Sequence, residues 1–210
     1  MARPSVGSPV IHPTLHHYGL ATVHLQRMLD WYASVLGMTP NLRSSTAIAT
    51  EGSSFATGVW ISNDRANHRI ALVTWPGLKD DEDKHAHTRV QHVAFEYATI
   101  DDLLNSYTRL KDLGIEPVIT ADHGPTIAFY YEDPDGNSVE LFVDNFGDWD
   151  KSTEFMRSSP EMAANPMGTF VDPEQMIVAR RRGACHADLH QRAYAGGFPP
   201  AGPTDPRALL

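Results

Sequence analysis

A β-hairpin is predicted at residues 128–143, where the sequence is Ala128-Phe-Tyr-Tyr-Glu-Asp-Pro-Asp-Gly-Asn-Ser-Val-Glu-Leu-Phe-Val143. Pro134 fixes φ and Gly136 tolerates positive φ, so the Asp-Pro-Asp-Gly segment is expected to turn the chain between two apolar strands. Glu140 stands out because it lies in the middle of the apolar second strand. A buried carboxylate is costly unless it is paired or coordinates a metal. The rest of the chain should therefore contain the groups that Glu140 needs.

The composition of the chain excludes several classes of protein. Its 210 residues, 41% of them hydrophobic, suit one domain or two small half-domains that share a core. The net charge of -9 without a basic stripe argues against nucleic acid as the main partner. No apolar run is long enough for a membrane span or a signal core, so a cytoplasmic protein is expected. Cys185 is the only cysteine, which rules out an intrachain disulfide or a CxxC metal site.

The first half of the chain is predicted to contain a strand, a helix and three further strands. Apolar residues recur at helical spacing from Leu25 to Leu36, and Gly37 suits the end of that helix. The elements are expected at residues 15–23 (strand), 24–37 (helix), and 46–50, 58–62 and 68–75 (strands).

The same order repeats after a polar, charge-dense segment at residues 77–88, which we interpret as a linker. Thr99 is the predicted start of the second helix because Asp101 and Asp102 follow in its first turn, and Gly114 is the predicted end. Neither repeated half can bury the apolar face of its sheet alone, so the two halves are expected to pack together. The elements are expected at residues 89–97 (strand), 99–114 (helix), and 117–121, 126–131 and 138–144 (strands).

The two ends of the chain depart from the repeat. Residues 1–13 are rich in proline and are expected to be poorly ordered. Residues 146–210 form a C-terminal extension with short helices predicted at 172–182 and 186–194. Asp172-Pro-Glu opens the first of them, with Asp172 as the N-cap. The extension covers the core, the functional site or a subunit interface, and the sequence leaves these three roles open.

Two histidines share a position in the repeat and are candidate partners of Glu140. His17 and His92 each lie in the first predicted strand of a half. Two imidazoles and one carboxylate leave metal coordination positions open, which suits non-haem Fe(II) oxygen chemistry. Each residue also has a plainer interpretation, because a single strand histidine is usually structural and Glu140 can pair with Arg69 or Arg89. The equivalent placement of the two histidines favours the metal site.

Four motifs carry a family resemblance that covers residues 14–145. They are His17-Tyr-Gly-Leu-Ala-Thr-Val23, the helix end from Tyr32 to Gly37, Gln91-His-Val-Ala-Phe95 and Asp133-Pro-Asp-Gly-Asn-Ser-Val-Glu-Leu141. Together they resemble the vicinal oxygen chelate superfamily, and within it the single-domain type I extradiol catechol dioxygenases. The resemblance implies an α+β fold. Two paired βαβββ modules, residues 14–76 and 89–145, would form a curled mixed sheet around a metal, with residues 146–210 as a helical and irregular extension.

The resemblance also implies the ligands of the metal. Carried over residue by residue, they are His17, His92 and Glu140, and they would hold Fe(II), although Mn(II) accepts the same set. His16 is the alternative to His17, because adjacent residues of a strand face opposite ways.

Three further residues match the acid–base and hydrogen-bonding groups of these enzymes. His68 precedes an apolar strand and would move a proton, while Tyr130 would donate a hydrogen bond to the substrate with help from His123. The spacing of His123 departs from the family pattern. The plainer alternatives are a turn residue for His68, a core aromatic for Tyr130 and a loop residue for His123.

The function implied by the resemblance is ring cleavage next to the two hydroxyls of a catechol by O2, in a protein that is expected to form a homo-oligomer. A glyoxalase or epimerase of the same fold is a rival, but its usual fourth ligand, an acid in the last strand of the first module, is absent from residues 70–75. A metal-free binding protein of the resistance type would lack the ligands. A relic that binds metal without turnover remains a third alternative.

Two further groups of residues, in the linker and in the C-terminal extension, have plainer interpretations. His85 and His87 lie in the charged linker and are interpreted as solvated, because nothing nearby completes a tetrahedral zinc site. The run Arg180-Arg-Arg182 is interpreted as a salt-bridging or interface face of a helix.

Overall fold

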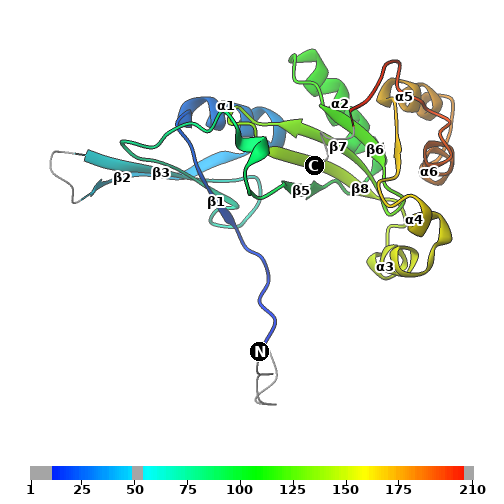
Figure 1. The fold of residues 1–210 in the computed structure, drawn as a ribbon, viewed down its shortest axis with the longest axis horizontal. Coiled ribbons are helices and arrows are strands. Elements are labelled where there is room, and N and C mark those ends of the chain that lie inside the picture. The colour runs from blue at the N-terminus through cyan, green and yellow to red at the C-terminus, as the bar shows by residue number, and fades with distance from the viewer. Residues whose placement is uncertain (1–10, 49–53, 206–210) are drawn as a thin grey trace.

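Two mixed β-sheets form the framework of the protein, seen here in a computed structural model (Figure 1). The structure describes residues 11–48 and 54–205. Residues 1–10 of the N-terminal segment, and the last two residues of the strand predicted at 46–50, lie outside the described residues. The predicted α+β class is confirmed by the sheets and helices of the described parts.

The first sheet has the predicted order of elements. They are β1 (Tyr18–Ala21), α1 (Leu25–Leu36), β2 (Thr39–Ile48), β3 (Ser54–Ser62) and β4 (Ile70–Thr74). β1 runs parallel to β4 and the other pairs are antiparallel, which gives the strand order β1-β4-β3-β2. α1 ends where predicted, because Gly37 adopts a left-handed conformation with φ of 65°. β2 begins at Thr39, earlier than predicted, and a register shift beside Pro40 lets the proline join the strand.

The second sheet repeats this topology. Its elements are β5 (His92–Glu96), α2 (Ile100–Asp112), β6 (Ile119–Asp122), β7 (Thr126–Glu132) and β8 (Ser138–Asp144), after a single 3₁₀ turn, η1 (Lys84–Ala86). β5 runs parallel to β8, followed by β7 and β6, so these strands correspond to β1, β4, β3 and β2. Thr99 caps α2 as predicted, because its hydroxyl accepts the backbone N–H of Asp102 at 3.1 Å.

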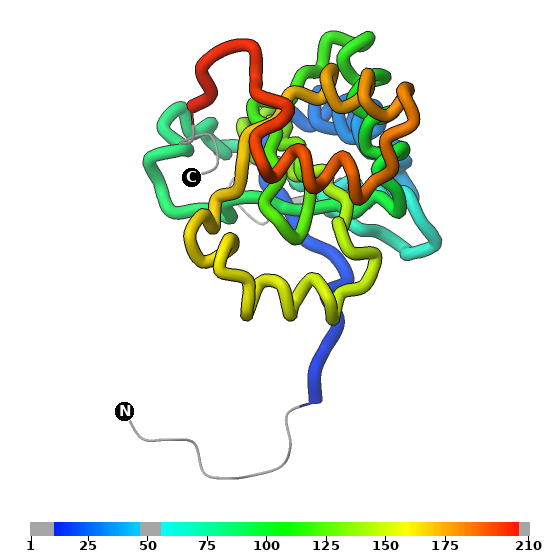
Figure 2. Tube along the Cα trace, turned by 90° about the vertical axis from the view of Figure 1, so that its right-hand side faces the viewer, coloured from blue at the N-terminus to red at the C-terminus, as the bar shows by residue number. Residues whose placement is uncertain are grey.

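The C-terminal extension gathers at the far end of the second sheet (Figures 1 and 2). It contains α3 (Trp149–Ser158), α4 (Pro160–Ala164), β9 (Thr169–Phe170), α5 (Pro173–Arg181) and α6 (His186–Tyr194). α5 and α6 were predicted, and Asp172 caps α5 through the backbone N–H of Glu174 at 2.8 Å. α3, α4 and β9 were not predicted, and β9 pairs with β6 to become the fifth strand of the second sheet.

One apolar core runs through both halves of the repeat. α1 covers the first sheet and α2 covers the second on the same side (Figure 1). Met28, Leu72, Leu103 and Leu141 come from both halves, are fully buried and belong to one cluster. Each such side chain contributes about 1.5–3 kcal/mol when it is removed from water, so the halves stabilise each other. Within the described residues, the helices are too short or too polar to cross a membrane.

Candidate metal centre

The turn of the β7–β8 hairpin is held by one buried carboxylate. Asp133 is 5% exposed, and its Oδ1 accepts the backbone N–H groups of Asp135 and Asn137 at 3.0 and 2.9 Å. Its Oδ2 accepts the Tyr32 hydroxyl at 3.0 Å, which joins the turn to α1. Gly136 adopts φ of 71°, as the sequence predicts. The turn sets the register in which Tyr130 and Glu140 lie directly opposite each other.

Glu140 and His92 form a buried pair on the second sheet. Glu140 is 7% exposed, and its Oε2 lies 3.0 Å from His92 Nε2 on the neighbouring strand β5. Ala94 is the residue directly opposite Glu140, so His92, two residues earlier, shares the same face. The hydrogen bond that His92 donates to the Glu140 carboxylate raises the pKa of His92, and burial opposes that shift.

The hydrogen bonds of His92 leave one ring nitrogen for Glu140. Its Nδ1 lies beside the side-chain oxygen of Gln91, which can only accept a hydrogen bond. His92 Nε2 therefore shares a proton with the Glu140 carboxylate in the absence of metal. When a metal ion binds to Nε2, that proton is released, because metal binding and protonation compete. Neither Arg69 nor Arg89 pairs with Glu140. Arg69 binds Asp64 and the backbone of residue 16, and Arg89 contacts His85.

Tyr130 and His123 continue the row of polar groups from Glu140. The Tyr130 hydroxyl lies 3.0 Å from His123 Nε2, and His123 Nδ1 lies 2.7 Å from the Met167 carbonyl oxygen. Because that carbonyl can only accept, Nδ1 carries the proton of a neutral His123 and Nε2 accepts the Tyr130 hydroxyl. Burial, followed by the Glu140 carboxylate, raises the pKa of Tyr130 above its usual range. The structure thus places four predicted site residues in one group on the second sheet.

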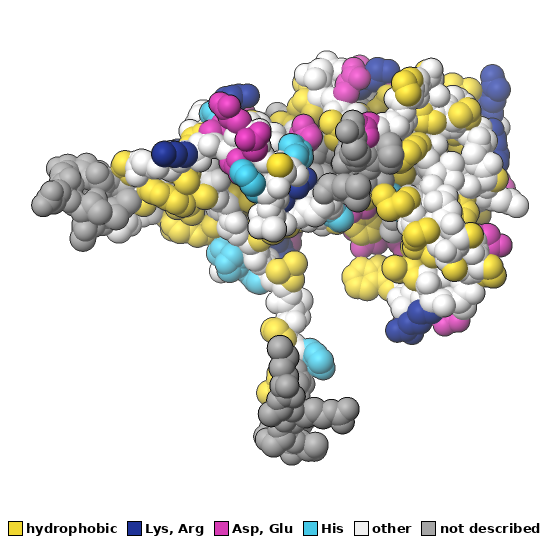
Figure 3. Space-filling model, viewed as in Figure 1, with side chains coloured by type: hydrophobic (Ala, Val, Ile, Leu, Met, Phe, Trp, Pro, Cys, Tyr) yellow, Lys and Arg dark blue, Asp and Glu magenta, His cyan; other side chains and the backbone are white. Residues whose placement is uncertain are grey.

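A second group of predicted residues lies on the first sheet. His17 precedes β1, at the base of an arm that extends away from both sheets, where histidine side chains gather (Figures 1 and 3). The rings of His17 and His68 have centroids 4.1 Å apart, and His16 Nδ1 lies 3.0 Å from His17 Nδ1. Arg69 donates to the His16 carbonyl at 2.9 Å and holds the arm. His17 is therefore outside the strand in which it was predicted, but beside His68.

The three predicted ligands are divided between these two groups. Among the side chains of residues 11–48 and 54–205, no three of His, Cys, Asp or Glu come together closely enough to hold a metal ion. His92 and Glu140 do fit such an ion, because an imidazole nitrogen and a buried carboxylate oxygen face each other and both suit Fe(II) or Mn(II). His17 as the third ligand, and the choice of His17 over His16, stay predictions.

A buried Asp122–His190 pair lies behind the site and was not predicted. The Asp122 carboxylate is fully buried, and it lies 2.8 Å from His190 Nδ1 and accepts the Gly124 N–H at 2.8 Å. Burial raises the pKa of Asp122, and the hydrogen bond from His190 opposes that shift. His123 follows Asp122 directly, so this pair ties α6 to the strand end that positions His123. The sequence carries no signal that brings His190, 68 positions later, to this strand.

Two sheets of one topology, with a histidine–carboxylate pair on the second, define a protein of the paired βαβββ class. The chain belongs to the Glyoxalase/Bleomycin resistance protein/Dioxygenase superfamily, whose family model matches residues 14–141. The fold of a domain of that name from Frankia sp. EAN1pec has a TM-score of 0.52 at 17% identity, over 66% of this chain and 96% of that one. The predicted superfamily is confirmed.

Two curated relatives come from Rhodococcus globerulus. Biphenyl-2,3-diol 1,2-dioxygenase 3 is 34% identical over 183 residues, which cover 87% of this chain and 90% of the relative. Biphenyl-2,3-diol 1,2-dioxygenase 2 is 37% identical over 161 residues, or 77% of this chain and 78% of the relative. In a 2,3-diol the 1,2 bond lies outside the pair of hydroxyls, so these are extradiol enzymes. The predicted extradiol dioxygenase activity is confirmed, and with it a divalent metal ion, an aromatic diol and O2 are implied.

Proposed function

We propose that this dioxygenase holds its metal ion through His92 and Glu140, with His17 as the third protein ligand and Fe(II) as the metal. The observation that carries the proposal is the buried Glu140 carboxylate, 3.0 Å from His92 Nε2 and without a lysine or arginine partner among the described residues. Mn(II) accepts the same ligands and is the alternative. When bound, the ion supplies Lewis-acid and electron-transfer chemistry toward the diol and O2.

The proposed substrate is an aromatic compound with two adjacent hydroxyls. Biphenyl-2,3-diol is the first to test, because both curated relatives are named for it. Their similarity covers at least three quarters of each chain and supports a substrate of the same chemical class.

His68 and Tyr130 are the proposed proton-handling groups. His68 Nδ1 lies 2.8 Å from Asn67 Oδ1, which leaves Nε2 free to accept a phenolic proton. Burial, followed by the charges of His17 and His16, lowers the pKa of His68, so its imidazole is neutral near pH 7. The raised pKa of Tyr130 keeps its hydroxyl protonated. Its single proton is directed at His123 Nε2 in this structure, so donation to a substrate oxygen requires the O–H to rotate away from His123 when the substrate binds. His123 positions that hydroxyl.

A lyase or isomerase with a fourth protein ligand is disfavoured by the first sheet. Ala71 lies opposite Gly19, two residues after His17, just as Glu140 lies opposite Ala94, two residues after His92. Ala71 is therefore the counterpart of Glu140 in the first sheet, and its methyl side chain offers no donor atom to a metal.

The proposal is tested by anaerobic reconstitution with Fe(II) and, separately, with Mn(II), followed by metal analysis. Oxygen uptake and the colour of ring-opened products are then measured with biphenyl-2,3-diol and catechol. Hydroquinone, whose hydroxyls are not adjacent, is the control. We expect uptake with the adjacent diols only and higher rates with Fe(II). A fully metal-loaded protein that consumes no oxygen with either adjacent diol would contradict the proposed substrate class.

A further inference from the structure

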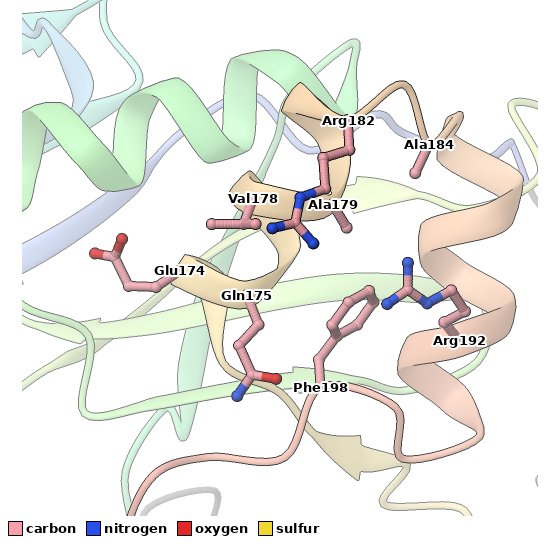
Figure 4. Close-up of a pocket in the computed structure, with 8 residues that line it drawn as sticks. All are labelled: Glu174, Gln175, Val178, Ala179, Arg182, Ala184, Arg192 and Phe198. Carbon is pink, nitrogen blue, oxygen red and sulfur yellow. The ribbon is translucent and has the colours of Figure 1, made fainter.

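A cavity in the C-terminal extension lies apart from the residues proposed for catalysis. It has a volume of about 470 Å³ and is formed by α5, α6 and the segment after α6 (Figure 4). Phe198, which is 1% exposed, forms part of its wall. This volume is enough for a ligand with one aromatic ring. Its lining residues are Glu174, Gln175, Val178, Ala179, Arg182, Ala184, Arg192 and Phe198.

Two arginine side chains point into this cavity. The guanidinium groups of Arg182 and Arg192 both extend toward Phe198 (Figure 4). Arg192 lies over the Phe198 ring, with its guanidinium carbon 4.4 Å from the centroid. Phe198 is in turn held in place by its backbone, because its carbonyl accepts the Asp172 N–H at 2.8 Å. One of the two cations is therefore positioned by an aromatic ring.

Neither guanidinium has an acidic partner within hydrogen-bond or ion-pair distance among the described residues. Asp188 lies one turn before Arg192 and interacts with it only through a longer-range electrostatic attraction. The Asp188 carboxylate accepts a hydrogen bond from the Cys185 N–H instead. Glu174 is the one acid of the lining, and it is bound to Lys111 and to the Tyr107 hydroxyl. Because Arg182 and Arg192 line a single cavity and neither is paired with an acid in the described part of the chain, they form a site of positive charge.

The neighbouring arginines show that this arrangement is specific to Arg182 and Arg192. Arg180 donates to both oxygens of Asp101, each at 2.7 Å, and ties α5 to α2. It therefore has the salt-bridging role predicted for the arginine run. Arg181 is exposed and does not line the cavity.

We propose that this cavity binds a small organic anion. Its carboxylate or phosphate group would lie between Arg182 and Arg192, because planar guanidinium groups match the geometry of these anions. The apolar body of the ligand would pack against Val178, Ala179 and Phe198. The site is independent of the proposed metal centre, because it shares none of its residues.

The test is calorimetric titration of the full-length, metal-loaded protein with benzoate and with phenyl phosphate. Benzylamine, with the same ring and the opposite charge, and benzyl alcohol, which is neutral, are the control ligands. The variants are Arg182→Gln and Arg192→Gln, with Arg181→Gln as the matched control. All three side chains are exposed, so the variants should fold, and circular dichroism checks this.

We expect at least one of the two anions to bind the wild type and the Arg181→Gln variant equally. Arg182→Gln and Arg192→Gln should each weaken it by about tenfold, as expected when a charge-assisted hydrogen bond is lost. Binding of the two control ligands should be weaker than that of the anion. The proposal is overturned if neither anion binds, if benzylamine binds as well, if both cavity variants bind normally, or if Arg181→Gln weakens binding to the same extent.

Discussion

Tyr130 lies directly opposite Glu140 across the β7–β8 hairpin, so a phenolic hydroxyl and a buried carboxylate share one face of the second sheet. The pKa of Tyr130 is raised partly by that carboxylate. His92 and His123 lie on either side of the pair, through contacts of 3.0 Å each. A single hairpin thus carries a proposed metal ligand and a proposed hydrogen-bond donor to the substrate.

The carboxylate of Glu140 is expected to be essential for metal binding. In Glu140→Gln the side chain keeps its shape but loses its charge, so the metal content after equilibrium dialysis should fall by about tenfold or more. Glu132→Gln, on the same hairpin but exposed, is the matched control and should keep its metal. If Glu140→Gln binds metal as well as the control does, the proposed centre is wrong.

Removal of the Tyr130 hydroxyl should slow turnover without loss of metal. We expect kcat of Tyr130→Phe to fall by about 100-fold, as for other donors to a developing oxyanion. Tyr131→Phe is the control, because its buried hydroxyl has no hydrogen-bond partner among the described residues. That variant should keep its activity and be at least as stable as the wild type. Equal kinetics for the two variants would exclude the role of Tyr130.

If His68 is an acid–base group, its removal should lower activity without changing the metal content. His68→Ala should retain its metal but lose turnover by about 100-fold or more, because general acid–base groups contribute at least that much. His87→Ala, in the exposed linker and paired with Asp81, should have no effect on either. Metal analysis and oxygen uptake on the same samples provide the test, and full turnover in His68→Ala would refute the assignment.

Stability at acidic pH should depend on the Arg69–Asp64 pair that anchors the N-terminal arm. Hydrogen bonding to Arg69 lowers the pKa of Asp64 from 3.8 to about 2. Because this pKa is lower in the folded protein, the pair stabilises the fold above the unfolded pKa, and the contribution is lost as the pH falls through about 2. In Arg69→Gln the pKa of Asp64 should return toward about 3.9, whereas Arg65→Gln should leave it low. NMR titration of the Asp64 carboxyl carbon measures both, and an unchanged pKa in Arg69→Gln would contradict the prediction.

The hairpin turn should make a large contribution to stability through Asp133. Asp133→Ala leaves several donors without an acceptor, the buried Tyr32 hydroxyl among them, so we expect a loss of about 2–4 kcal/mol in the free energy of unfolding. Tyr32→Phe removes only one of these hydrogen bonds and should cost about 1 kcal/mol. Chemical denaturation of both variants gives the comparison. If the two variants lost the same free energy of unfolding, the other hydrogen bonds accepted by Asp133 would contribute nothing to stability.

Local signals in the sequence were sufficient for most of the fold. Gly37 and Thr99 mark the ends of helices by their own backbone or side-chain chemistry, and the turn before Glu140 follows from proline and glycine. α3 and α4 were missed although each has a local cap, Asp148 and Ser159. Two other features that were missed depend on other parts of the chain. β9 has two residues and exists only because β6 offers an edge, and β2 includes Pro40 only because its register shifts there.

The sequence by itself determined which residue types can form the site, because the repeat places His17 and His92 in equivalent positions and leaves Glu140 in an apolar strand. Only the tertiary structure decided which of them meet. His92 meets Glu140 because β5 and β8 are hydrogen-bonded neighbours, whereas His17 belongs to the edge of the other sheet. Contacts within a sheet follow from strand register. Contacts between sheets, and those of Asp122 with His190, depend on packing of the whole chain, which no local pattern encodes.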